Sequence, residues 1–471
     1  MRIIVWALII WLCGFAYSLV FLLWIRILIY LCAAYCLGLH PLSALDEAWL
    51  LDSKVNKCQP VCYVTFDKND AKAIRNAILE RLVGNCVRLR CCITRFLGHN
   101  FMKELPREEI EKCLEILDEN EHHLHTEKDL GDFLSKTIND PIPLSTPQWR
   151  MWLYENYSET QSALLFKEHH VMADGLGILE IILLIVDEFK PEAIIDFRPT
   201  SWLKQMFLYL ISPLFIFYYL IPILCKRRDR SSITNVPLSG ERQFAIGKRF
   251  SLEDMKRSSR DLGVSMNDLA AGALSRGLAE YLADQKDIDH SKTLTAMVPV
   301  NLRTKKVRKP SDVKLQNNFT LVLLDFKMGQ TLEDEIKRVN RLMKKAKSSI
   351  KPLTTMFIQQ LIIRFLPLFI TKPLMDYTAG KCTLAFSNVP GFKEDLTVLG
   401  SRANELLFFT PCMSKIGVGV SMVSHVDYFK MGISADTNVV KDPYLLLDKI
   451  EKNIQKCINL ELHSDETFSL P

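Results

Sequence analysis

The feature that most restricts the fold of this chain is an uncharged apolar run at its N-terminus. Residues 3–25 carry only apolar, small or hydroxyl side chains, and a second apolar run follows Arg26 as far as Leu39. About 20 apolar residues match the roughly 30 Å hydrocarbon thickness of a bilayer. The run exceeds the roughly 7–15 residues of a signal-peptide core and lacks a clear small-x-small cleavage site. We therefore predict a retained membrane anchor over residues 1–39, which either crosses once or bends back near Gly14 or Arg26.

A second apolar segment occupies the middle of the chain. Residues 202–225 are rich in aromatic and aliphatic side chains, include Pro213 and Pro222, and end at a basic cluster over residues 226–230. Such a cluster is typical of the cytosolic side of a membrane. A buried core helix is the alternative, but the aromatic density and the abrupt basic end favour the bilayer interface. We predict a membrane-associated segment with a basic linker over residues 201–230.

The rest of the 471 residues is long enough for two globular lobes. The periodicity of apolar residues predicts strands at 61–66 and 163–166 and helices at 69–82 and 176–189. Before them, the pattern predicts a helix that Ser43 caps, with apolar residues at Leu45, Trp49 and Leu50. Beyond the linker it predicts helices at 252–262, 265–274, 332–347, 356–374 with an interruption at Pro367, and 443–457, and strands at 293–300, 319–326, 383–387, 416–423 and 428–435. A mixed α/β lobe is therefore expected on each side of the linker.

A histidine motif follows the predicted strand at 163–166. It reads His169-His170-Val171-Met172-Ala173-Asp174-Gly175. An imidazole titrates near pH 6.5, so it can take a proton from a hydroxyl and return it within one turnover. A single histidine would more often be a buried residue satisfied by hydrogen bonds. The full spacing instead favours a catalytic base that a turn directs into a cavity.

The other polar patterns predict neither a metal site nor a nucleic-acid site. The net charge of +5 is modest, and no basic-aromatic cluster accompanies it. The 13 cysteines lack zinc-site spacings, and an odd, irregular set suits reduced thiols facing the cytosol. The histidines at 122, 123 and 125 lie among glutamates, which favours a solvated surface.

Several motifs together resemble the wax ester synthase/diacylglycerol acyltransferase family, the bifunctional type within the CoA-dependent acyltransferase superfamily. Besides the histidine motif they are, in chain order, Pro41-Leu42-Ser43-Ala44-Leu45-Asp46, Pro147-Gln148-Trp149-Arg150, Asn267-Asp268, Val298-Pro299-Val300-Asn301-Leu302-Arg303 and Ser387-Asn388-Val389-Pro390-Gly391. The histidine motif alone also occurs in peptide-synthetase condensation domains, whereas the combination is far more specific. The chain departs from the family pattern at Gln316-Asn317-Asn318 and at Ser424-His425-Val426-Asp427.

The resemblance implies an α/β, two-lobe fold like that of chloramphenicol acetyltransferase, here with an N-terminal membrane anchor. Residues 40–200 would form the N-terminal lobe with the histidine motif, and residues 231–471 the C-terminal lobe. Both lobes would build one tunnel. A single membrane crossing within residues 202–225 would separate them, so we expect a re-entrant or interfacial segment with both lobes on the cytosolic side.

The resemblance also implies roles for the motif residues. The catalytic set would be His170, His169 and Asn267, with His170 as the general base and His169 supporting the turn or the neighbouring lobe. Asn267 would donate a hydrogen bond to the oxyanion, although Asn267-Asp268 could equally form a helix cap with Ser265. Structural support is expected from Asp174, with Arg303 as its candidate partner, and from Gly175 and Asp268. No substrate-binding residue is predicted.

The implied reaction transfers a fatty acyl group from acyl-CoA, as co-substrate, to a long-chain alcohol or diacylglycerol, giving wax esters or triacylglycerol. No further cofactor is expected. The expected location is the endoplasmic reticulum membrane, with lipid droplets as the alternative. A non-catalytic membrane protein that binds or transfers lipid and retains the fold is the competing hypothesis. A condensation-type enzyme is disfavoured by the membrane segments and the lack of carrier modules.

Overall fold

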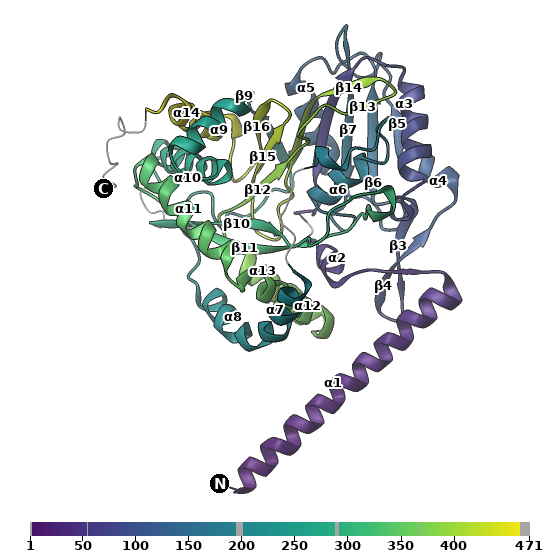
Figure 1. The fold of residues 1–471 in the computed structure, drawn as a ribbon, viewed down its shortest axis with the longest axis vertical. Helices are drawn as coiled ribbons and strands as arrows, with labels where there is room; N and C mark the ends of the chain where they lie inside the picture. Colours follow the sequence, from purple (N-terminus) through teal and green to yellow (C-terminus); the bar gives the residue numbers. More distant parts are fainter. Residues whose placement is uncertain (1, 54, 195–200, 288–291, 367, 462–471) are drawn as a thin grey trace.

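The computed structural model describes residues 2–53, 55–194, 201–287, 292–366 and 368–461. It shows two α/β lobes side by side and a long helix that projects from them (Figure 1). The two-lobe α/β architecture predicted from the sequence is confirmed. The remaining residues, including 195–200 at the predicted lobe boundary and Pro367, lie outside the described part of the chain.

The N-terminal lobe is built on one mixed sheet. Its strands follow the order β13 (Thr397–Val398), β14 (Ser401–Phe409), β2 (Val61–Asp67), β7 (Gln161–Glu168), β6 (Trp149–Tyr154) and β5 (Leu114–Ile116). Its helices include α3 (Ala71–Ala77), which continues as a π-helical turn (Ile78–Val83), α4 (Arg107–Glu111), α5 (Glu127–Ile138) and α6 (Gly175–Ile182). The helix predicted at 176–189 therefore ends seven residues early, at Ile182.

The C-terminal lobe has a second mixed sheet. Its order is β11 (Phe319–Lys327), β10 (Thr293–Asn301), β12 (Leu384–Pro390), β15 (Val418–His425), β16 (Tyr428–Asp436) and β8 (Arg242–Ile246), with β9 (Phe250–Ser251) paired to β16. Its helices include α9 (Leu252–Asp261), α10 (Met266–Asp284), α11 (Leu332–Ser348) and α14 (Pro443–Asn459). A Cβ at Gly272 would lie 2.4 Å from Cγ1 of Ile336, so glycine is what lets α11 pack closely on the buried helix α10.

One segment of the C-terminal half belongs to the other lobe. Strand β14 pairs antiparallel with β2, with Leu407 opposite Tyr63, so it extends the N-terminal sheet. Leu407 and Phe409 are buried there, and β14 covers a strand edge that would otherwise be open. The predicted assignment of all residues from 231 to 471 to the C-terminal lobe is therefore wrong for β13 and β14.

The N-terminal apolar run forms one helix, α1 (Arg2–Leu37), which passes Gly14 and Arg26 without a break. At 1.5 Å per residue it is about 54 Å long, longer than a bilayer core. Arg26 joins it to the lobes, because its Nη1 donates to the carbonyl of Arg364 at 2.9 Å and its Nη2 lies 3.3 Å from Oε2 of Glu47. Beyond Arg26 the helix packs on the small sheet β1 (His40–Pro41), β4 (His99–Glu104) and β3 (Cys91–Phe96), against Phe101.

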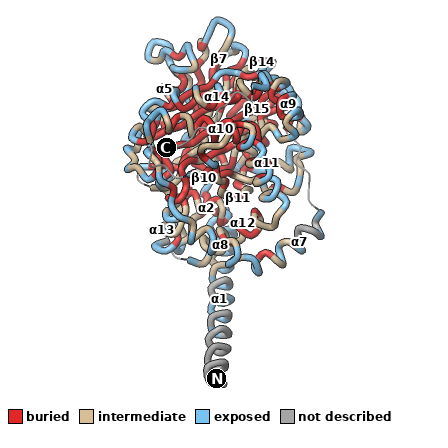
Figure 2. Tube along the Cα trace, turned by 90° about the vertical axis from the view of Figure 1, so that its left-hand side faces the viewer, coloured by how far each residue is buried: buried red, intermediate tan, exposed pale blue. Residues whose placement is uncertain are grey.

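The second apolar segment forms two short helices, α7 (Trp202–Ile211) and α8 (Ile216–Cys225), joined by a 3-10 turn (Ser212–Phe215) that contains Pro213. Within the described residues one stretch, Met206–Cys225, has the length and composition to cross a membrane, and this turn interrupts it. Helices α12 (Lys351–Phe365) and α13 (Leu368–Ala379) lie beside them, split as the sequence predicts. All four helices lie at the end of the body from which α1 projects (Figure 2).

Candidate active site

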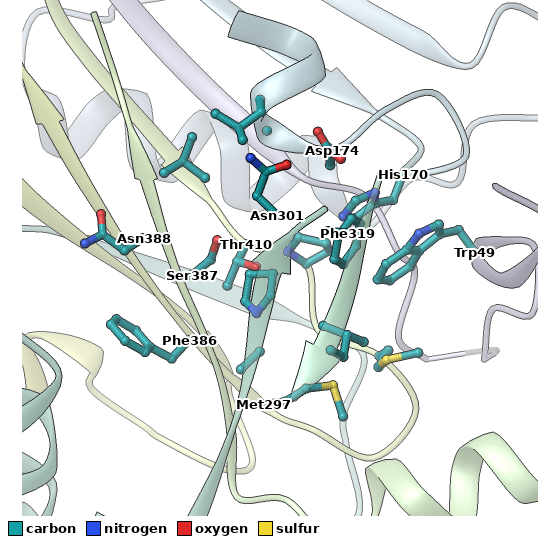
Figure 3. Close-up of a pocket in the computed structure, with 18 of the residues that line it drawn as sticks. Trp49, His170, Asp174, Met297, Asn301, Phe319, Phe386, Ser387, Asn388 and Thr410 are labelled. Atoms are coloured by element: carbon teal, nitrogen blue, oxygen red, sulfur yellow. The ribbon is translucent and has the colours of Figure 1, made fainter. Parts of the chain in front are cut away.

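His170 lies in the turn between β7 and α6, where the two lobes meet (Figure 3). Its imidazole stacks on the indole of Trp49, with ring centroids 3.9 Å apart and planes 2° from parallel. Phe319, the first residue of β11, lies 5.7 Å from the same ring. Trp49 ends α2 (Ala44–Trp49), a helix capped by Ser43 as the sequence predicts. The ring is thus fixed by side chains from two separate parts of the chain.

The surroundings of His170 keep its imidazole neutral. Burial disfavours the imidazolium and lowers the pKa of His170 to about 4. Its Nδ1 is enclosed and has no hydrogen-bond partner within the described residues. The backbone is fixed as well, because its N–H donates to the carbonyl of Cys58 and its carbonyl accepts from Nδ2 of Asn317, both at 2.8 Å. A neutral, fixed imidazole is the form that can accept a proton.

This lowered pKa predicts the pH dependence of any reaction that needs neutral His170. A lowered pKa means that the neutral form persists below the ordinary imidazole value of about 6.5. We expect kcat/KM to stay level from pH 8 to below pH 6 and to fall only as the pH approaches about 4. Initial rates across this range, corrected for enzyme stability, would measure the midpoint. A midpoint near pH 6.5 would contradict the burial of the ring.

His169 does not reach the cavity that His170 faces. Its Nδ1 accepts a hydrogen bond from the N–H of Val171 at 3.1 Å, so the ring proton lies on Nε2. Nε2 is 3.2 Å from Oδ2 of Asp52. Both nitrogens are therefore occupied, and His169 holds the turn to the loop that carries Asp52. A direct part in the chemistry is not supported for His169.

Asp174 caps a helix and pairs with an arginine of the other lobe. Its Oδ1 accepts from the N–H of Gly177 at 2.9 Å and caps α6. Arg303 makes a bidentate ion pair with it, with both contacts at 2.8 Å, and the N–H of Asn318 donates to Oδ2 at 2.7 Å. The predicted pairing with Arg303 is confirmed, and it joins the histidine turn to the C-terminal lobe.

Gly175 is needed for close packing rather than for an unusual backbone angle. A Cβ at this position would lie 2.9 Å from Cγ2 of Val389. Val389 belongs to the Ser387–Gly391 motif, so this contact brings two of the sequence motifs together across the lobe boundary.

Asn267 does not line the cavities around His170, and its predicted role at the oxyanion is not supported. Its Oδ1 accepts from Nδ2 of Asn388 at 3.0 Å, and Asn388 points away from His170 (Figure 3). The reason is local, because Ser265 and Asp268 form a capping box that fixes the first turn of α10. Asp268 thus holds the first turn of α10. Ser387 and Thr410, by contrast, line the same cavities as His170.

Two connected cavities meet at His170. The central cavity lies between the lobes and is lined by, among others, Trp49, Asn301, Phe319, Ser387 and Thr410. The N-lobe cavity runs from His170 between the sheet and helices α3 and α6, with an almost wholly apolar lining and an empty volume of about 1670 Å3, open solvent included. His170, Ser387 and Thr410 line both cavities.

Glu168 is a further residue of the N-lobe cavity that the sequence analysis missed. Its Oε2 is buried without a partner in the described part of the chain. Burial raises the pKa of Glu168 well above its usual range, so the carboxyl group is neutral. The signal was its position at the end of the strand, two residues before His170. No group of three His, Cys, Asp or Glu residues within the described ranges is placed to hold a metal ion.

Comparisons with known proteins agree with this geometry. Residues 125–201 match the model of the wax ester synthase/diacylglycerol acyltransferase catalytic domain, and residues 315–457 match the WS/DGAT C-terminal domain. The wax ester synthase/diacylglycerol acyltransferase 3 of Arabidopsis thaliana is 26% identical over 384 residues, which cover 69% of this chain and 74% of the relative.

Two solved structures share the fold. The wax ester synthase/diacylglycerol acyltransferase from Marinobacter aquaeolei has a TM-score of 0.63 at 17% identity, over 90% of this chain and 100% of the other. The starter condensation domain of rhizomide synthetase RzmA, in complex with C8-CoA, has a TM-score of 0.57 at 15% identity. The match covers 91% of this chain and 96% of that domain. At these identities the likeness shows the fold alone.

Proposed function

The chain belongs to the wax ester synthase/diacylglycerol acyltransferase family, and from this premise we propose that His170 is the general base of its acyl transfer. The protein is an acyl-CoA-dependent O-acyltransferase. The acceptor is a long-chain alcohol or diacylglycerol, and the product a wax ester or triacylglycerol. One observation carries the assignment to His170: a neutral imidazole lines two cavities, one of which has the almost wholly apolar lining that suits a fatty chain.

The acceptor hydroxyl is a weak nucleophile because its pKa is far above 7. His170 removes its proton while the oxygen attacks the thioester carbonyl of acyl-CoA, which contributes roughly 10²–10⁴-fold to the rate. Since Nδ1 is enclosed, Nε2 is the nitrogen that accepts the proton. When the tetrahedral intermediate collapses, the carbon–sulfur bond breaks and the imidazolium returns the proton to the CoA thiolate. No acyl-enzyme is required.

The oxyanion of this intermediate needs hydrogen-bond donors. Ser387 and Thr410 are better placed than Asn267, because both residues line the two cavities that His170 also lines. One such donor is typically worth roughly 3–4 kcal/mol in the transition state. We assign the oxyanion site to these two hydroxyls.

The N-lobe cavity suits the fatty chain of the donor. Its lining comes largely from Val, Leu, Ile and Phe side chains of β2, β7, β14, α3 and α6. An acyl chain bound there would place its thioester beside His170 and leave the CoA portion toward the central cavity. The solved relative in complex with C8-CoA supports an acyl-CoA donor in this fold.

Helix α1 and the helices at the same end of the body support membrane attachment. Large apolar side chains are exposed on α8, on α13 and on the turn that joins α7 to α8, among them Phe217 at 71%, Phe369 at 77% and Leu214 at 80%. These helices lie at the end of the body from which α1 projects (Figure 2). We propose that this end rests in the bilayer interface while α1 inserts, with both lobes on the cytosolic side of the endoplasmic reticulum or on a lipid droplet.

A shared site requires both lobes on one side of the membrane. His170 precedes residues 202–225, whereas Phe319 and Ser387 follow them, and all three line one cavity. We therefore expect the sequon at Asn156 to remain unmodified when the chain is made with endoplasmic reticulum membranes. A shift in electrophoretic mobility that an N-glycosidase removes would contradict this arrangement.

The activity is tested by supplying purified protein in vesicles with labelled acyl-CoA and either hexadecanol or diacylglycerol. We expect labelled ester with at least one acceptor, and the ratio of the two rates identifies the preferred one. Protein that retains bound acyl-CoA but forms no ester with either acceptor would instead support a lipid-binding protein with an acyltransferase fold.

A further inference from the structure

A third cavity lies on the side of His170 that faces the membrane-associated helices. We call it the membrane-side cavity. It is enclosed by β10, β11, α2, α8, α12 and α13, and its lining includes Leu220, Ile223, Ile358, Ile362, Leu374 and Met375. It shares Trp49, Met297, Phe319, Leu321 and Met413 with the central cavity. The apolar lining therefore continues from helices α8, α12 and α13 to the residues that stack on His170.

The helices around this cavity are apolar on both sides. On α8, Leu220 and Ile223 line the cavity, while Phe217 is 71% and Ile221 is 53% exposed. On α13, Leu374 lines the cavity while Phe369 and Ile370 are exposed. A helix that is apolar all round is not stable in water and is normally surrounded by core or lipid. One side of these helices therefore suits lipid, and the other leads to the active site.

We propose that the membrane-side cavity is a lateral entrance through which the acceptor lipid passes from the bilayer to His170. Its fatty chain lies between α8, α12 and α13 while its hydroxyl passes Trp49 and Phe319. The inference rests on the proposed acyl transfer. The donor chain occupies the N-lobe cavity, so two apolar chains approach one imidazole from different sides, and neither needs to leave an apolar environment.

Two polar side chains within the entrance support a substrate that carries oxygen. The hydroxyl of Thr355 is buried, with the residue 7% exposed, and has no partner in the described part of the chain. Gln359 lines the same cavity, and its Oε1 accepts from Thr320 at 3.2 Å. Leaving a buried hydroxyl unpaired is costly, and an acceptor hydroxyl or ester oxygen passing Thr355 would satisfy it.

The test narrows the entrance without touching the residues around His170. Ile362→Trp on α12 and, as a second variant, Leu220→Trp on α8 each place an indole in the cavity. The exposed Leu445→Trp on α14 is the matched control. Each protein is assayed in vesicles with hexadecanol and, separately, with water-soluble 1-butanol, which reaches the central cavity from solution. Thermal unfolding in detergent identifies the variants that fold.

We expect the ratio of the hexadecanol rate to the butanol rate to fall at least about tenfold in a folded entrance variant and to stay at the wild-type value in Leu445→Trp. An unchanged ratio in both folded entrance variants would overturn the lateral entrance while leaving acyl transfer intact. If the wild type forms no ester with hexadecanol, butanol or diacylglycerol, the proposed function itself fails.

Discussion

Replacing His170 with alanine is expected to lower kcat for ester formation by roughly 10²–10⁴-fold. The alcohol would then have to lose its proton without a positioned base, since the other nearby histidine, His169, has both ring nitrogens occupied. Steady-state rates of purified protein with labelled acyl-CoA and the preferred acceptor measure the effect. The KM for acyl-CoA should change little, because the fatty chain is held by the N-lobe cavity.

His123→Ala is the matched control for this loss, because His123 lies on the exposed surface. It should keep the wild-type kcat. His170→Ala also removes a ring from the stack with Trp49, so its thermal unfolding must be compared with that of the wild type. A folded His170→Ala protein with kcat within about twofold of the wild type, far short of the usual effect of a general base, would exclude His170 from that role.

Replacing Arg303 with methionine is expected to destabilise the folded protein by roughly 3–5 kcal/mol. The guanidinium pairs with Asp174 and lies 3.3 Å from Glu180, and all three side chains are buried. Without it the Asp174 carboxylate stays in a poorly hydrated place with no cation. Denaturant unfolding in detergent measures the loss. Arg402→Met is the control, because it removes only an exposed contact to Asp395, and it should lower the free energy of unfolding by no more than about 1 kcal/mol.

The loss of folding stability caused by Arg303→Met should depend on pH. Burial raises the pKa of Glu180 to about 7, and the nearby guanidinium opposes this shift. Removing Arg303 raises the pKa of Glu180 further, so the folded variant takes up a proton as the pH falls and recovers part of its stability. The destabilisation should therefore be larger at pH 8 than at pH 6. The double variant Asp174→Asn/Arg303→Met should lose less folding stability than the sum of the losses in the two single variants. Strict additivity would contradict a direct pair.

The elements that depend on local rules could be predicted from the sequence. Ser43 and Ser265 cap the helices where the spacing places them, and apolar alternation locates the central strands β2 and β7. The pairing of Asp174 with Arg303 also follows from the motifs, although 129 residues separate them. These features carry their signal within a few residues or within a recognisable motif.

What could not be predicted depends on contacts between distant segments. Nothing near Trp49 indicates that its ring will stack on His170, and the apolar periodicity predicts no strand at 401–409, where β14 joins the sheet of the other lobe. Asn267 shows the limit of a motif, because the pattern identifies the residue but not the direction of its side chain. That direction is set by the cap at Ser265 and by Asn388.

The central claim is that His170 catalyses transfer of an acyl group from acyl-CoA to a lipid alcohol. The most direct measurement uses membranes that carry equal amounts of the wild type or of His170→Ala, supplied with labelled acyl-CoA and both hexadecanol and diacylglycerol, with the products resolved by chromatography. We predict labelled wax ester or triacylglycerol from the wild type and only background label in the esters from the variant. Equal ester from both membranes would contradict the claim.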